Sequence, residues 1–157
     1  MPIAQGFTLL EVLVALLIFS VGLLGLAGMQ IHGAQNTRIA LVRSIAVQQA
    51  YDMAERIRSN RAGVLAGDYD NLNIIEVTCA ANNSCSPTTH IHQYDFQVWN
   101  NSVTELLPSG HGVVENQNST LTVTIHWDEG HSGGSATMNC PPTQDTDLAC
   151  YQLTVIP

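Results

Sequence analysis

The most prominent pattern in the sequence is a long apolar run near its beginning. From Phe7 to Ile31 only one residue, Glu11, is charged. A run of this length suffices for a helix that crosses about 30 Å of hydrocarbon. A secretory signal peptide is the alternative, but it would carry basic residues before its apolar core, and residues 1–6 contain none. The run is also too long for a signal peptide, so the pattern predicts a transmembrane helix.

Beyond the apolar run, the hydrophobic positions fall on one face of a helix. They recur at spacings of three and four residues: Ile39, Val42, Ala46, Ala50, Met53 and Ile57. Asn60 and Gly63 are suited to a helix end near residue 61. We therefore expect a single helix of about 55 residues and roughly 80 Å. Its first half would lie in lipid and its second half would pack on a domain.

Shorter elements follow this helix. Alternation of apolar and polar residues predicts strands with one buried face, whereas apolar spacings of three and four predict a helix. The predicted elements are a strand at Asn73–Cys79, an amphipathic helix at Tyr94–Leu107, a turn at Ser109–Gly112, a strand at Thr120–Trp127, a loop at Asp128–Pro142 and a strand at Ala149–Ile156. The expected fold class is α+β, with a long N-terminal helix followed by a small antiparallel β-sheet domain.

Charge is distributed unevenly along the chain. All five basic residues are arginines and lie between Arg38 and Arg61, whereas ten acidic residues and no basic ones follow Ala62. An acidic domain repels phosphate backbones, so we expect no direct nucleic-acid binding. The acidic surface is instead suited to keeping an exported domain soluble. For Arg56, Arg58 and Arg61 we expect a solvated or salt-bridged helix face, near the helix end whose carbonyls favour cations.

The four cysteines, Cys79, Cys85, Cys140 and Cys150, all follow the apolar segment. Their spacings match neither the usual zinc pattern nor a C-x-x-C redox motif. An even number in a domain beyond a membrane segment favours two disulfides in an oxidising compartment. Three connectivities are possible, and we favour the two local pairs, Cys79 with Cys85 and Cys140 with Cys150.

Histidines offer a conceivable metal site. Alternation would place His90 and His92 on one face of a strand, while His126, Asp128 and His131 cluster after the strongest strand signal. Nothing in the sequence brings these two groups together, so we expect no metal site. The sequence also has no nucleophile elbow, P-loop or H-E-x-x-H pattern, so we expect neither enzymatic activity nor a cofactor.

Glu11 is the residue that most needs an explanation. A carboxylate inside hydrocarbon costs at least a few kcal/mol and indicates a function. The apolar run contains no cation that could pair with it. If the chain were cut after Gly6, the new amino group of Phe7 would lie one helical turn away. Two unit charges about 4 Å apart attract by roughly 4 kcal/mol at an effective dielectric constant of 20.

The segment G-F-T-L-L-E-V-L-V-A-L-L at Gly6–Leu17 resembles the class III signal of type IV prepilins and related pseudopilins. The resemblance implies that a prepilin peptidase cuts after Gly6 and N-methylates Phe7. It also implies that Glu11 helps to register an incoming subunit during assembly. Most members carry a basic residue before the glycine, and M-P-I-A-Q has none.

Three further segments resemble the minor pilin family called PilV, or type IV pilus modification protein: Ile18–Gln30, Asp52–Gly63 and Leu106–Val114. This resemblance implies a pilin-like fold and a role in priming or modifying type IV pilus assembly, with effects on twitching motility, adhesion or DNA uptake. The implied partners are other major and minor pilins, the prepilin peptidase, the inner-membrane assembly platform and membrane lipid. The expected parts are a leader at 1–6, a transmembrane and assembly helix at 7–31, a domain-packed half of the helix at 32–63 and the sheet domain at 64–157.

The resemblance also implies a location. The protein would first span the inner membrane once, with its C-terminal domain in the periplasm, and later lie in a pilus on the cell surface. The arginines beyond the membrane segment favour the opposite orientation by the positive-inside rule. The cysteines and the leader motif favour the periplasmic one.

Two alternatives share some of these features. A pseudopilin of a type II secretion system would carry the same signal, although Gly22, Gly25 and Gly28 and the segment Asp52–Gly63 favour the pilus family. A plain single-pass membrane protein with an acidic binding domain would share the helix and the charge, but it would not be cut after Gly6.

Overall fold

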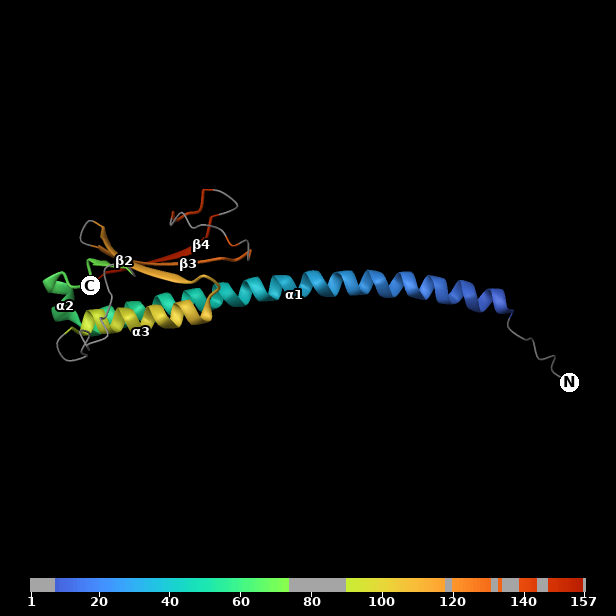
Figure 1. The fold of residues 1–157 in the computed structure, drawn as a ribbon, viewed down its shortest axis with the longest axis horizontal. Coiled ribbons are helices and arrows are strands. Elements are labelled where there is room, and N and C mark those ends of the chain that lie inside the picture. Colours follow the sequence, from blue (N-terminus) through green and yellow to red (C-terminus); the bar gives the residue numbers. More distant parts are fainter. Residues whose placement is uncertain are drawn as a thin grey trace. The chain divides into compact units, whose positions relative to one another are not determined.

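The fold is described from a computed structural model of the full chain (Figure 1). The described residues are 8–73, 90–117, 120–130, 133, 139–143 and 147–156. The chain divides into two compact units, residues 1–40 and residues 41–157.

The first element is the helix α1, Leu9–Ser59, whose 51 residues run without interruption from the apolar segment into the second unit. It ends close to the predicted position because Asn60 begins another short helix. The side-chain oxygen of Asn60 accepts a hydrogen bond from the backbone N–H of Gly63 at 3.2 Å, which caps α2, Arg61–Ala66. Gly67 ends α2 in the left-handed conformation at φ 81°, which favours glycine.

The helix α3, Ile91–Leu106, confirms the predicted amphipathic helix and begins three residues earlier than expected. It lies beside the C-terminal part of α1 (Figure 1). Its buried face carries Phe96, Trp99 and Val103. The indole N–H of Trp99 donates to the backbone carbonyl of Gln49 at 2.8 Å, so α3 is joined to α1 by a hydrogen bond as well as by apolar contact.

Four antiparallel strands form one sheet in the order β1-β2-β3-β4. The strands are β1, Asn71–Leu72; β2, His111–Gln117; β3, Thr120–Trp127; and β4, Ala149–Val155. β3 and β4 confirm the two strands predicted in the C-terminal part. The strand predicted at Asn73–Cys79 lies outside the described residues, apart from Asn73 at its start.

The strand β2 was not predicted, and the turn expected at Ser109–Gly112 is wrong at its second half. His111 and Gly112 already belong to β2. Gly112 faces the ring of Trp99, where a Cβ atom would collide with the indole. Its backbone N–H donates to the side-chain oxygen of the buried Asn100 at 2.9 Å. The glycine therefore serves close packing of α3 on the strand rather than a turn.

The core lies between the two helices and the sheet. Small side chains on α1, namely Ala46, Ala50 and Ala54, are fully buried and allow close approach of the helix. From the sheet, Val123 and Ile125 of β3 are also fully buried. The predicted α+β fold, a long N-terminal helix followed by a small antiparallel sheet, is confirmed.

Candidate assembly helix and processing segment

The start of α1 is fixed by Thr8. The backbone N–H of Glu11 donates to the carbonyl oxygen of Thr8 at 3.1 Å and lies 3.4 Å from its hydroxyl oxygen. Thr8 and Glu11 thus have the spacing of a capping box, in which a threonine and a glutamate three residues later satisfy free N–H groups. Sequence reasoning missed Thr8, although the T-x-x-E pattern before an apolar run could have identified it.

Gly6 and Phe7, the predicted cleavage and methylation positions, lie outside the described residues. Glu11 is described and lies in the first turn of α1, exposed. No ion pair of Glu11 is present among the described residues. Its carboxylate is therefore open to a cation supplied from outside the described part of the chain.

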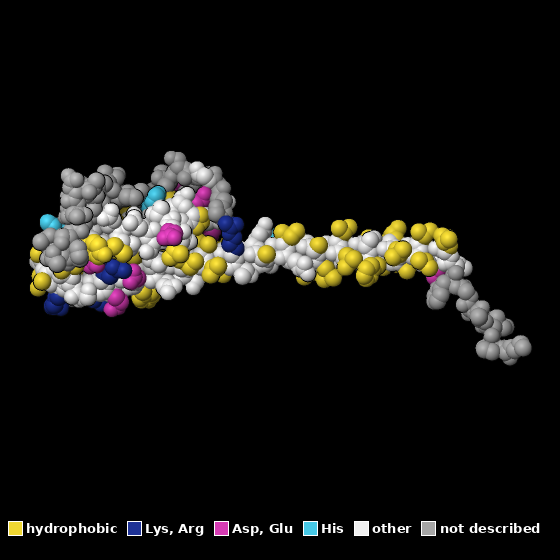
Figure 2. Space-filling view, turned by 60° about the horizontal axis from the view of Figure 1, so that its bottom comes forward, with side chains coloured by type: hydrophobic (Ala, Val, Ile, Leu, Met, Phe, Trp, Pro, Cys, Tyr) yellow, Lys and Arg dark blue, Asp and Glu magenta, His cyan; other side chains and the backbone are white. Residues whose placement is uncertain are grey.

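The N-terminal part of α1 is apolar on all sides. Its large apolar side chains from Leu9 to Ile31 are 49–79% exposed. Figure 2 shows these hydrophobic side chains along the helix. By length and composition, α1 is the one helix among the described residues that could cross a membrane. Such a surface needs lipid or other apolar helices around it.

Glycines occur within this same segment without interrupting it. A Cβ atom added at Gly22, Gly25 or Gly28 would have no heavy atom within 4 Å beyond its own helix. The helix is continuous through all three positions. Because these glycines have no side chain, the helix surface is lower at their positions, and another helix can approach closely there.

The arginines take part in several ion pairs. Arg56 contacts Asp52 at 3.1 Å and Asp95 at 3.4 Å, and Arg58 contacts Glu55 at 2.6 Å. The predicted salt-bridged helix face is thus present for Arg56 and Arg58.

Arg43 makes a two-pronged contact with Glu129, at 2.6 Å and 2.8 Å. The hydrogen bond and charge of Arg43 lower the pKa of the Glu129 carboxyl. This pair ties α1 to the segment that follows β3.

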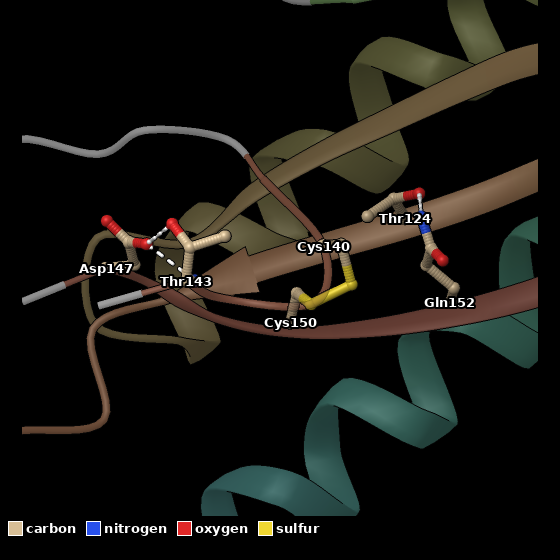
Figure 3. The surroundings of a disulfide bond; sticks show 6 residues. All are labelled: Thr124, Cys140, Thr143, Asp147, Cys150 and Gln152. Atoms are coloured by element: carbon tan, nitrogen blue, oxygen red, sulfur yellow. Dashed lines mark hydrogen bonds between the residues drawn. A yellow bond between two sulfur atoms is a disulfide. The ribbon is translucent and has the colours of Figure 1, made fainter. Parts of the chain in front are cut away.

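Cys140 and Cys150 form a disulfide, the favoured pairing for these two residues (Figure 3). Cys79 and Cys85 lie outside the described residues, so their pairing stays a prediction. Inside the closed loop, the carboxylate of Asp147 accepts hydrogen bonds from the backbone N–H and the hydroxyl of Thr143, at 2.8 Å and 2.9 Å. The disulfide links Cys140 to β4, and the two hydrogen bonds link Thr143 to Asp147, which lies two residues before β4.

The expected strand face of His90 and His92 is wrong, because His90 precedes α3 and His92 lies within it. His126 instead lies opposite His111 on the neighbouring strand β2. Burial, followed by the nearby His111, lowers the pKa of His126 and favours its neutral form. Among the described residues, no group of three or more His, Cys, Asp or Glu side chains is arranged to hold a metal. His131 lies outside them.

Comparison with known families agrees with the helix and its motif. Residues 1–27 match the prokaryotic N-terminal methylation motif, and residues 28–97 match the family described as type IV pilin Tt1218. No curated protein and no solved structure gives a significant match. The two matched segments are consecutive and include the whole of α1. Over residues 1–97 the chain is thus type IV pilin-like, similar to a family of non-enzymatic structural proteins and processed at its N-terminal methylation motif, and its apolar helix is consistent with an anchor in the inner membrane before assembly.

Proposed function

We propose that this pilin is a minor pilin, which primes or modifies the assembly of a type IV pilus. The observation that carries the proposal is the exposed carboxylate of Glu11 at the start of a helix that is otherwise apolar on every side. A carboxylate charge surrounded by lipid costs free energy and needs a partner. The amine created at Phe7 of a neighbouring subunit supplies that partner.

The proposed sequence of events begins in the inner membrane, with the C-terminal domain in the periplasm. Prepilin peptidase cuts after Gly6 and methylates Phe7. At the assembly platform, Glu11 pairs with the terminal amine of another pilin while α1 exchanges lipid for neighbouring helices. The protein then reaches the cell surface within the pilus.

The minor role is supported by the resemblance of Ile18–Gln30, Asp52–Gly63 and Leu106–Val114 to the PilV family. The glycines of the first of these segments leave open places on the helix surface. Twitching motility, adhesion or DNA uptake would follow from pilus assembly as a whole. Because residues 62–157 carry ten acidic side chains and no basic ones, DNA contact would need a more basic partner.

The deciding experiment is N-terminal mass spectrometry of the protein recovered from sheared surface filaments. We expect a chain that begins with N-methylated Phe7 and is present in far smaller amounts than the major subunit. A chain that is absent from filaments would contradict the proposal.

Deletion of the gene separates this role from that of a type II secretion pseudopilin. Loss of pili with normal secretion of exoproteins supports the minor pilin, and the reverse result supports the pseudopilin. A bond between Gly6 and Phe7 that stays uncut after incubation with prepilin peptidase would refute both roles.

A further inference from the structure

The strand β4 forms one edge of the sheet. All seven of its residues, Ala149–Val155, pair with β3 on one side. Among the described residues, no strand pairs with its other side. The backbone N–H and C=O groups on that side form a template to which another extended chain can add.

The sequence of β4 lacks the features that usually protect such an edge. Natural edge strands carry charged residues, proline or bulges that prevent pairing with other chains. The segment A-C-Y-Q-L-T-V has no charged residue, no proline and no glycine. An uncharged seven-residue edge of this composition pairs readily with another strand, so we expect a specific cover in the assembled state.

Apolar side chains along this edge are incompletely covered. Tyr151 and Leu153 of β4 are only partly buried, and both pack against the core. By contrast, the core-facing residues of β3 are fully or almost fully buried. We call Tyr151 and Leu153 the apolar seam. An added strand would bury this seam further with alternate side chains.

A basic cavity lies where β4 ends. It measures about 220 Å³ and is lined by Ile57, Arg58, Arg61, Val64 and Ile156. Ile156, directly after β4, is 80% exposed. Arg58 contacts Glu55, whereas no ion pair of Arg61 is present among the described residues. Two guanidinium groups beside exposed apolar surface are suited to a segment that carries both an apolar side chain and a carboxylate.

We propose that an extended segment of a different pilin subunit adds to the free edge of β4, with alternate apolar residues on the apolar seam and a carboxylate at Arg58 and Arg61. Antiparallel addition is favoured because that ladder is slightly more stable per residue than a parallel one. The identity of the partner rests on the proposed minor pilin function. The strand addition itself rests on the edge, the seam and the basic cavity.

Photo-cross-linking in cells that assemble the pilus tests this contact on the full chain. Benzoylphenylalanine is placed at Thr154, which is exposed on the edge strand, or at Thr122, its direct partner on β3. Both side chains lie on the same face of the sheet. A partner that covers this face would cross-link to both positions equally, whereas a strand at the edge would cross-link several-fold more at Thr154. The cross-linked peptide is identified by mass spectrometry, in total membranes and in sheared filaments.

Charge reversal at Arg61 is the second part of the cross-linking experiment. We expect Arg61→Glu to lower the cross-link at Thr154 several-fold and Arg61→Lys to retain most of it. Glu105→Arg, an exposed change of the same size on α3, is the matched control and should leave the cross-link unchanged. Formation of the Cys140–Cys150 disulfide, seen by non-reducing gel mobility, verifies that each variant folds.

The outcomes separate this inference from the proposed function. A membrane cross-link from Thr154 to an acidic, strand-forming segment of another pilin supports the edge contact, even if the protein is missing from filaments. Equal cross-linking at both positions, a cross-link only to a helix or to a second copy of this chain, or no cross-linked pilin would overturn it. A protein that is present in filaments but gives any of those results would retain its pilin role and lose the edge contact.

Discussion

The two parts of α1 share one continuous backbone but differ in what surrounds their side chains. Between Leu9 and Ile31, the large apolar residues are at least about half exposed on every side of the helix. Between residues 41 and 59 a single stripe is fully buried: Ala46, Ala50, Met53, Ala54 and Ile57. A helix that is apolar all round requires lipid or other helices, whereas an amphipathic helix requires a domain.

This difference separates assembly from folding. Changes in the first part should alter processing and incorporation while the stability of the domain stays the same. Changes in the second part and in the sheet should lower the stability of the domain without altering the cleavage motif.

Gly6→Val should abolish processing. In the proposed processing the peptidase cuts after residue 6, and a branched side chain there would prevent the chain from fitting the site of the enzyme. Gel mobility and mass spectrometry of the membrane fraction should detect only the uncut chain. Ala4→Val places the same side chain two residues earlier and should be cut normally. Efficient cleavage of the Gly6 variant would place the cut elsewhere.

Glu11→Ala should leave membrane insertion intact and lower incorporation into filaments. Loss of the proposed charge pair, worth roughly 4 kcal/mol, would reduce incorporation at least about tenfold. The measurement is the ratio of filament to membrane protein by immunoblot. Ser20→Ala removes a hydroxyl that bonds only within the same helix, to the carbonyl of Leu17 at 2.8 Å, and should behave as wild type. Normal incorporation of the Glu11 variant would remove this carboxylate from the mechanism.

Trp99→Ala should destabilise the domain by about 3–5 kcal/mol, the usual cost of removing a buried tryptophan. Trp99 is fully buried, and its indole bonds the carbonyl of Gln49. Chemical denaturation of the detergent-solubilised chain, followed by circular dichroism, measures the loss. Glu105→Ala, exposed on the same helix, should change stability little. Processing after Gly6 should be unaffected, and a defect there would contradict the separation of the two regions.

The sequence predicted those elements whose periodicity is long or strict. The apolar run and the helical stripe define α1, and strict alternation defines β3. β2 escaped because its start, His111 and Gly112, has the composition of a turn. The position of β2 depends on the contacts of Gly112 with Trp99 and Asn100, which belong to α3 and not to the local pattern of β2. The start of β2 is therefore determined by tertiary packing and not by local sequence.

The part of the candidate site that the sequence predicted is the residue whose charge is unfavourable in its surroundings. Glu11 was identified because a lone charge in an apolar helix is costly. Alternation misled at His90 and His92, because a short apolar and polar alternation does not distinguish a strand from the start of a helix. The partner of Arg43, Glu129, is 86 residues away, and no local pattern connects the two.

Replacing Cys140 and Cys150 by serine should cost less than the loss of Trp99. The bridge spans 10 residues, and closing a loop of that length stabilises a fold by about 2–3 kcal/mol through the unfolded chain. We expect faster proteolysis within the loop between Thr143 and Asp147 and a modest fall in melting temperature. Wild type with reductant should show an effect at least as large, because reductant also breaks the predicted bridge between Cys79 and Cys85. Complete unfolding would show that the bridge supports the core rather than the loop.

The ion pair between Arg43 and Glu129 should have the smallest effect. Arg43 is 62% exposed, and surface ion pairs contribute at most about 1 kcal/mol. The pKa of Glu129 is lowered in the folded chain from an ordinary value of 4.5, first by its hydrogen bond to Arg43. The pair therefore stabilises the fold above pH 4.5, and this contribution is lost as the pH falls through the lowered pKa.

The measurement for this pair is the difference in unfolding free energy between wild type and Glu129→Gln across the pH range. The difference should be constant at neutral pH and should vanish in acid. Protonation of buried His126 also destabilises the fold in acid, because burial lowers its pKa below 6.5. This destabilisation begins below pH 6.5 and is the same in wild type and in Glu129→Gln, so it cancels in the difference between them. A difference that persists in acid would mean that Glu129 acts through packing and not through its charge. The charge of Arg43 would then contribute nothing to the contact between α1 and the segment after β3.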